Sequence, residues 1–193
     1  MKTETNNVFV GKFRWFYTLN YYNMVTKLDK TAENVVQLLK ERGLALAAAE
    51  SCTGGLISAE ITSVSGSSDV FGYGVCTYAN EAKMKLLGVR EETLASVGAV
   101  SEETAVQMAE GVRKLAGADI AVSVTGFAGP TGGTPEKPVG TVYIGCSTEK
   151  RTFAKRYLFT GAEFPEAADG REAIRYETAL TALETVITEI KTN

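Results

Sequence analysis

The chain has 193 residues, of which 45% are hydrophobic and 22% are charged, as expected for one soluble globular domain with a single core. Its formal net charge of −3 gives no basic excess of the kind that marks nucleic-acid or membrane-surface binders, and no apolar run is long enough to span a bilayer. It contains no histidine, which excludes Ser-His and Cys-His catalytic pairs and His-ligated metals, so a general base would have to be Lys, Tyr, Asp or Glu.

Residues 1–23 are unusually rich in aromatic side chains and show no steady period. They lack the apolar core and small-residue cleavage site of a secretory signal, so export is not predicted. Met24 is the preferred start, which makes residues 1–23 a mis-called or flexible extension and residues 24–193 the domain. The alternative is an ordered arm that packs on a neighbouring molecule.

From Met24 onward, predicted helices alternate with short apolar strands. The helices are predicted over Thr31–Arg42, from the segment Ser51–Gly55 to Ser63, from an Asn80 cap to Leu87, from Ser101 to Leu115 and over Arg171–Lys191. The strands are predicted over Leu44–Ala49, Gly72–Tyr78, Ile120–Thr125, Val139–Ser147 and Thr152–Phe159, the last two as a hairpin. This order predicts a three-layer α/β/α sandwich around a mainly parallel mixed sheet with one antiparallel strand.

Three cysteines, Cys52, Cys76 and Cys146, form no CxxC pair and are odd in number. This pattern argues against a disulfide framework or a structural zinc site and favours a reducing cytoplasm.

Polar residues follow several predicted strands, at the sheet edge where ligands bind in folds of this class. The segment Ser51–Gly55 joins a strand to a helix, whose N-terminal amides can attract an anion or stabilise an oxyanion. Helix capping by Ser51 or Thr53 would explain the same residues without any catalysis.

Lys83 is predicted in the first turn of the helix that follows Thr77–Asn80. The helix dipole and partial burial would both disfavour its charge there, so its neutral amine could take a proton from a serine. An ordinary solvated lysine is the competing interpretation. Ser68 precedes the intervening strand, which would hold it roughly 23 Å from Lys83, so Ser51 is the better partner within one chain unless Ser68 arrives from a folded-back loop or a second subunit.

A glycine-rich loop runs from Ser123 to Gly133 between two strands, and its backbone could approach a ligand closely. It matches neither a dinucleotide nor a Walker A motif, so a long turn without function is the alternative. Arg171 and Arg175 open the last helix and are candidates to hold a phosphate or carboxylate.

Six segments taken together resemble the CinA C-terminal-domain family, also called nicotinamide-nucleotide amidases: AAAESCTGG, SGSSDVF, TYANEAK, GAVSEET, SVTGFAGPTGG and KPVGTVYIG. The resemblance covers Val25 to the end of the chain. It implies an anticodon-binding-domain-like α/β/α fold, a homodimer or higher homo-oligomer, and hydrolysis of nicotinamide mononucleotide to nicotinic acid mononucleotide and ammonia without a metal or other cofactor. Longer CinA proteins carry a further N-terminal domain, and the present chain looks like the stand-alone amidase form.

The resemblance also implies the site residues. The expected catalytic set is Ser51, Ser68, Tyr78 and Lys83, with either serine as nucleophile. The expected substrate-binding set is Thr53, Gly54, Gly55, Thr125, Gly126, Gly129, Gly132, Gly133 and Arg171. The segment between Gly161 and Arg171 is longer than the family's usual turn, which puts the phosphate role of Arg171 in question. A catalytically silent nucleotide-binding or partner-binding module, or an amidase for another substrate such as free nicotinamide, are the alternative functions.

Overall fold

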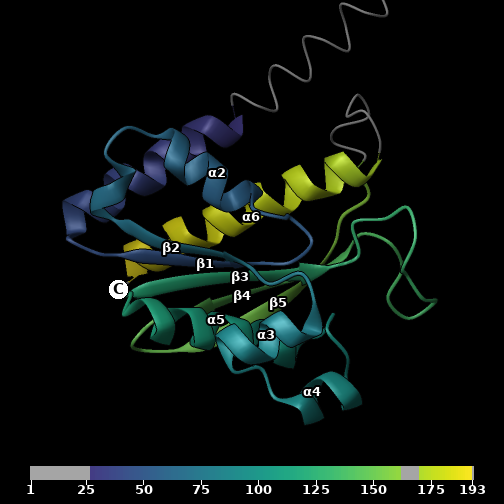
Figure 1. The fold of residues 1–193 in the computed structure, drawn as a ribbon. Helices are drawn as coiled ribbons and strands as arrows, with labels where there is room; N and C mark the ends of the chain where they lie inside the picture. The colour runs from purple at the N-terminus through teal and green to yellow at the C-terminus, as the bar shows by residue number, and fades with distance from the viewer. Residues whose placement is uncertain (1–26, 162–169, 193) are drawn as a thin grey trace, which may run out of the picture.

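Residues 27–161 and 170–192 are described by a computed structural model, in which a five-stranded sheet lies between two layers of helices (Figure 1). The aromatic-rich extension of residues 1–23 lies outside the described residues. Within the described ranges, none of the helices combines the length and apolar character needed to cross a bilayer.

The sheet has the strand order β2-β1-β3-β4-β5. β1 (Leu46–Glu50) pairs in parallel with β2 (Phe71–Cys76) and with β3 (Ile120–Gly126). β4 (Thr141–Ser147) is antiparallel to β3 and to β5 (Thr152–Leu158). β4 therefore runs against the other four strands, which confirms the predicted α/β fold with one antiparallel strand and a final hairpin.

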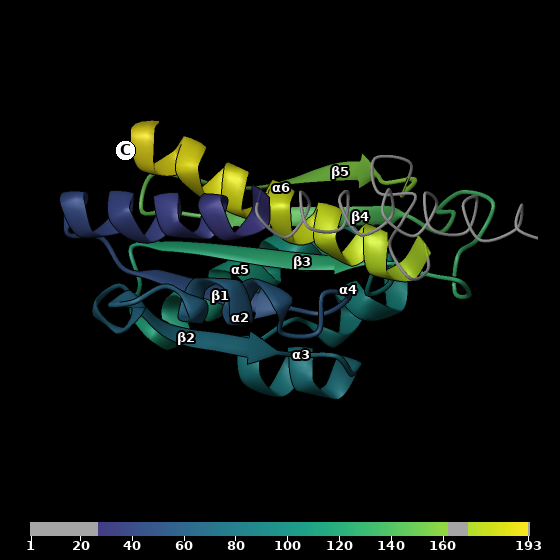
Figure 2. The ribbon, with the colours of Figure 1, turned by 90° about the horizontal axis from the view of Figure 1, so that it is seen from above.

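Helices cover both faces of the sheet because the inner strands β1, β3 and β4 are buried almost throughout. One face carries the helix over residues 27–42, α2 (Leu56–Ser63) and α6 (Gly170–Thr192), and the other carries α3 (Asn80–Leu87) and α5 (Glu102–Ala116), with α4 (Glu91–Ser96) between these two in the chain (Figures 1 and 2). Val35 and Leu183 belong to the core on the first face, and Met108 and Val112 to the core on the second.

The predicted helix ends are correct at Ser101 and wrong at Asn80. Ser101 accepts a hydrogen bond from the amide of Thr104 at 3.2 Å and caps α5. At α3 the capping position is Ala79, whose backbone is extended, and Asn80 is already helical, so its side chain does not cap the helix. α4 and the short 3-10 helix η1 (Ser67–Asp69) are not predicted, because one or two turns are too short to show a period.

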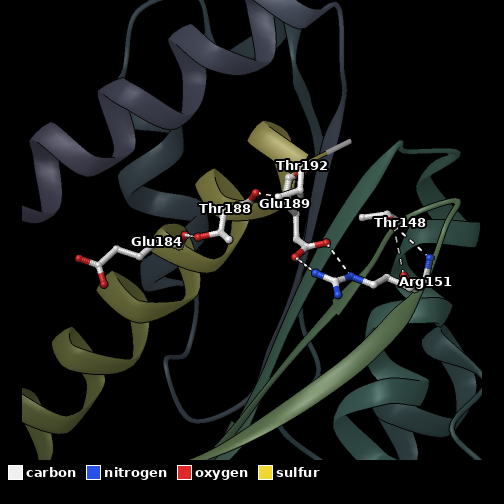
Figure 3. Close-up of polar contacts among 6 residues, drawn as sticks. All are labelled: Thr148, Arg151, Glu184, Thr188, Glu189 and Thr192. Atoms are coloured by element: carbon white, nitrogen blue, oxygen red, sulfur yellow. Dashed lines mark hydrogen bonds and ion pairs between the residues drawn. The ribbon is translucent and has the colours of Figure 1, made fainter.

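An ion pair joins the β4–β5 hairpin to the C-terminal part of α6 (Figure 3). Arg151 donates from Nε to Oε2 of Glu189 at 3.2 Å and makes a second hydrogen bond from Nη2 to the same carboxylate. The Glu189 side chain is buried, and these hydrogen bonds compensate for the water that its carboxylate loses. This contact holds the C-terminal end of α6 against the hairpin. The first turn of α6 lies at the opposite end of the strands, beside the pocket at their carboxyl ends.

Candidate active site

The carboxyl ends of β1, β2 and β3 meet at one edge of the sheet, where Glu50 is in register with Cys76 on one side and Val124 on the other. A pocket of about 180 Å³ opens beyond this edge, at the place where parallel sheets bind ligands. Its wall contains Ser51, Cys52, Tyr78, Asn80, Lys83, Ala99, Val100, Thr125, Gly126, Ala128 and Arg171.

Lys83 is the buried lysine of this pocket, with only 1% of its surface exposed. Its Nζ lies 2.7 Å from the carbonyl oxygen of Thr77, 3.2 Å from that of Tyr78 and 3.2 Å from Oγ of Ser51. Burial lowers the pKa of Lys83 from its ordinary value of 10.5. A neutral amine has two N–H groups and one lone pair, which match two carbonyl acceptors and one hydroxyl donor.

Ser51 follows β1 directly, and its amide donates to the carbonyl of Val124 in β3 at 3.1 Å. This hydrogen bond extends the strand pairing and points the chain toward the edge of the sheet. The structure therefore places Ser51, rather than Ser68, beside Lys83 within one chain, as strand geometry predicts. Ser68 is exposed in η1, at the other end of β2, and is not brought to the pocket by its own chain.

Glu50 fills the N-terminus of α2, a feature that the sequence analysis missed. Its buried carboxylate accepts hydrogen bonds from the amides of Gly55, Ile57 and Ser58 at 3.0, 3.1 and 2.8 Å. It also accepts from the hydroxyls of Thr53 and Ser58, at 2.7 and 2.6 Å. The expectation that this helix end attracts the anionic part of a ligand is corrected, because an internal carboxylate already occupies it.

The same contacts give three residues of the expected binding set structural roles. The Thr53 hydroxyl is buried on Glu50, and Gly54 and Gly55 supply the positive φ angles, +63° and +99°, of the turn into α2. Among the amides of residues 51–55, those of Ser51, Gly54 and Gly55 already bind Val124, Ser51 and Glu50. The amides of Cys52 and Thr53 are the remaining candidates in this segment for the expected oxyanion role.

Tyr78 and Arg171 form the rim of the pocket. Tyr78 is 62% exposed, and its hydroxyl oxygen accepts a hydrogen bond from Nη2 of Arg171 at 3.1 Å. Nη1 of Arg171 donates to the carbonyl of Gly129 at 2.6 Å, so this guanidinium joins two loops across the opening. Arg175, one turn further along α6, instead donates to the carbonyl of Thr53 at 2.7 and 3.2 Å and holds the loop that carries Ser51.

The glycine-rich loop contributes Thr125, Gly126 and Ala128 to the wall of the pocket. Thr125 lies in the wall and donates to the carbonyl of Ala99 at 2.7 Å, and Gly126 lies beside it. Gly132 and Gly133 are exposed and lie outside the described wall of the pocket, so their expected role in substrate binding stays a prediction.

Lys137 is a second residue that the sequence analysis missed in this region. Its Nζ donates to the carbonyls of Val97 and Val100 at 3.0 and 2.7 Å. These contacts tie the connection between β3 and β4 to the segment before α5, which supplies Ala99 and Val100 to the pocket wall. A lone lysine near the end of a loop carries no sequence signal for such a contact.

Cys52 lies next to Ser51 but is a poor nucleophile. Burial raises the pKa of its thiol to about 12, so the thiol stays protonated near neutral pH. Of the two adjacent side chains, only Ser51 has a base within hydrogen-bond distance.

The sequence model of the CinA C-terminal domain matches residues 28–190. This chain belongs to the CinA C-terminal domain family. It is 51% identical over 158 residues to a CinA-like protein of Kosmotoga olearia and 52% identical over 156 residues to one of Thermotoga maritima. These alignments cover 82% and 81% of this chain but 36% of each relative, so the chain spans about a third of the length of these curated relatives.

Solved structures of the family have the same fold. The competence/damage inducible protein CihA of Agrobacterium tumefaciens is 40% identical and superimposes with a TM-score of 0.77, covering 84% of this chain and 94% of that one. A CinA superfamily protein of Klebsiella pneumoniae is 33% identical, with a TM-score of 0.78, and the alignment covers 86% of this chain and 99% of that one.

Proposed function

We propose that this CinA-family chain is an amidase that hydrolyses the carboxamide of nicotinamide mononucleotide to nicotinic acid mononucleotide and ammonia. The observation that carries the proposal is the buried Lys83 amine 3.2 Å from the Ser51 hydroxyl, in a chain without histidine. The pair has the arrangement of a nucleophile and its general base.

In the proposed reaction, neutral Lys83 takes the proton of Ser51 while Oγ forms a bond to the carboxamide carbon. The electron pair of the carbonyl moves to its oxygen, which the amides of Cys52 and Thr53 stabilise; one such donor typically contributes about 3 kcal/mol. When the carbonyl re-forms, the C–N bond breaks and the Lys83 ammonium protonates the leaving group, which departs as ammonia. Water then attacks the acyl-enzyme, Lys83 accepts its proton, and that proton returns to Ser51 as the acid leaves.

Arg171 and Tyr78 are assigned to substrate binding at the rim. Arg171 presents a fixed guanidinium at the opening, which suits the phosphate of a nucleotide. Tyr78 accepts from Arg171, so its own hydroxyl proton is available to the substrate, which it orients. Binding of the ribose phosphate at this rim would hold the pyridine amide against Ser51.

The test is incubation of the purified chain with nicotinamide mononucleotide, with ammonia and the acid product measured. Turnover by the wild type, and none by Ser51→Ala, is the expected result. Nicotinamide riboside and free nicotinamide, tested in parallel, separate a nucleotide amidase from a general one. Tight binding in calorimetry without any product would favour the alternative of a silent binding module.

A further inference from the structure

A groove lies where the described part of the chain begins. Its wall combines Lys27, the first described residue, with residues 158–160 at the end of β5 and with one side of the middle of α6. Figure 2 shows that the helix over residues 27–42 starts beside α6, and Nζ of Lys27 lies 4.0 Å from Oε1 of Glu184 there. The groove encloses about 320 Å³, which is sufficient for large side chains.

Part of this groove is apolar. Leu158 at its edge is 57% exposed, although it belongs to a strand. Phe159 beside it is partly buried and stacks on Tyr157, with ring centroids 5.4 Å apart, and Leu180 of α6 joins the wall to the core. A single exposed leucine is ordinary, but an apolar patch in the wall of a groove is typical of a contact surface.

The residues directly before Lys27 match this surface in composition. Residues 15–26, WFYTLNYYNMVT, contain no charged side chain, and five of them are aromatic. Segments that stay in water are poor in aromatic residues, whereas aromatic side chains gain large buried areas when they pack. This stretch therefore has the composition of a packed segment, and it enters the described structure at the groove.

We infer that residues 15–26 lie in this groove of their own chain, with Tyr21 and Tyr22 against Leu158 and Leu180. Tyr22 is five positions before Lys27 and can reach roughly 17 Å from it, at ~3.3 Å for each residue. Both tyrosines can therefore enter the groove without any rearrangement of the helix over residues 27–42. The sequence offered a neighbouring molecule as the place of an ordered arm, and the groove offers a place on the same chain.

The charges on the two sides are complementary. The groove wall contains Glu177 and Glu184 against Lys27, whereas the only charged residues between positions 5 and 26 are Lys12 and Arg14. The side chain of Glu184 is 52% exposed, so a cation from the segment can approach it. Exposed ion pairs contribute little free energy, so the apolar contacts carry the docking and the charges favour it.

A single-tryptophan reporter tests the docking in the full chain. Trp15 is the only tryptophan, so Trp15→Phe combined with Tyr22→Trp places the only indole at the inferred contact. Its acrylamide quenching constant in the folded protein is expected to be several-fold lower than in urea. Equal constants in the two states would overturn the inference.

Two leucine substitutions in the reporter chain test the place of docking. Leu158→Lys puts a charge of the same sign as Lys12 and Arg14 into the groove, and should raise the quenching constant to its value in urea with unchanged circular dichroism. Leu115→Lys, at a 44% exposed leucine after the middle of α5, is the matched control and should leave the constant unchanged. Protection that survives Leu158→Lys, or that is lost when the protein is diluted, would place the segment elsewhere or on another molecule and would overturn the inference.

Urea unfolding of chains that keep Trp15 tests the same contact by stability. Tyr22→Ser should lower the unfolding midpoint, and Phe9→Ser, outside the docked stretch, should not. In a Leu158→Lys background the effect of Tyr22→Ser should disappear, because the two residues no longer meet, whereas additive effects would show that they do not interact. The groove and the pocket at Ser51 share no wall residue, so the inference is independent of the proposed function. A chain without amidase turnover would contradict that function and leave these outcomes decisive for the docking.

Discussion

The Nζ of Lys83 and the Oγ of Ser51 lie 3.2 Å apart, although the two residues come from different elements separated by 32 positions. β1 ends just before Ser51, and β2 leads into α3, which carries Lys83. The two strands are parallel neighbours, so their carboxyl ends deliver both side chains to one place.

Removing either partner should stop the reaction without unfolding the chain. Ser51→Ala and Lys83→Met are expected to lower kcat by about 10³-fold or more, because nucleophile and base act as a unit. Met nearly matches the volume of Lys but leaves the carbonyl of Thr77 without its donor, so a loss of about 1–3 kcal/mol of stability with the fold intact is expected. Steady-state kinetics and urea unfolding of both variants check this prediction, and a Lys83→Met enzyme with near-normal kcat would contradict the mechanism.

The pH dependence should report the Lys83 amine. Only its neutral form accepts a proton, so kcat/KM should rise with pH and level off below 10.5, since burial lowers the pKa of Lys83. Between the lowered pKa and the ordinary one, the unfolded chain binds more protons than the folded chain, so the free energy of unfolding should also rise with pH. In Lys83→Met the free energy of unfolding should not change over this pH range. The same slope in both proteins would show that another group causes the pH dependence.

Cys52 should be dispensable for catalysis. Its pKa is raised to about 12, so Cys52→Ala is expected to keep kcat within about threefold and to lose about 1 kcal/mol of stability from the small cavity. In native protein a thiol reagent should modify the exposed Cys76 before the buried Cys52 and Cys146. Inactivation by Cys52→Ala with the fold intact would point to the thiol as nucleophile.

Substitution of Arg171 should weaken substrate binding, whereas substitution of Arg175 should disturb the position of Ser51. Arg171→Ala is expected to raise KM for the nucleotide by about 10-fold to 100-fold, the value of a charged hydrogen bond, but not KM for nicotinamide riboside. Arg175→Ala, which frees the carbonyl of Thr53, should mainly lower kcat for both substrates, because the Ser51 loop loses its support. Equal effects of the two changes on both substrates would contradict this division.

Glu60, which is outside the described pocket wall, should make the free energy of unfolding depend on pH. Burial and the neighbouring Asp29 raise its pKa from 4.5 to about 7. Between these values the folded chain binds more protons than the unfolded chain, so stability should fall as pH rises. Glu60→Gln should therefore gain about 1 kcal/mol at pH 8, after allowance for solvent screening, and nothing below about pH 4.5. Urea unfolding at both pH values, with the exposed Glu33→Gln as control, provides the measurement.

Much of the pocket could be predicted because strand ends converge. Ser51, Tyr78, Lys83 and Thr125 each lie at or soon after the end of a predicted strand, and in a mainly parallel sheet these ends meet. Arg171 was harder to place, because the turn of α6 decides which of two nearby arginines faces the pocket.

The contacts of Glu50 and Lys137 could not be predicted. A carboxylate at the end of a strand gives no sign that it will fold back onto the next helix, and a loop lysine gives no sign of which carbonyls it will bind. Both depend on tertiary packing between elements that are distant from one another in the sequence. Ser68 differs again, since it is exposed in η1 and lies outside the pocket of its own chain.

The Glu50 carboxylate is an internal counter-ion at the N-terminus of α2. A helix N-terminus without an internal partner can bind sulfate, phosphate or a nucleotide from solution. Here the anion is part of the chain itself, so the turn that presents Ser51 has its conformation before any substrate binds. Inorganic anions therefore find no open binding site at the N-terminus of α2.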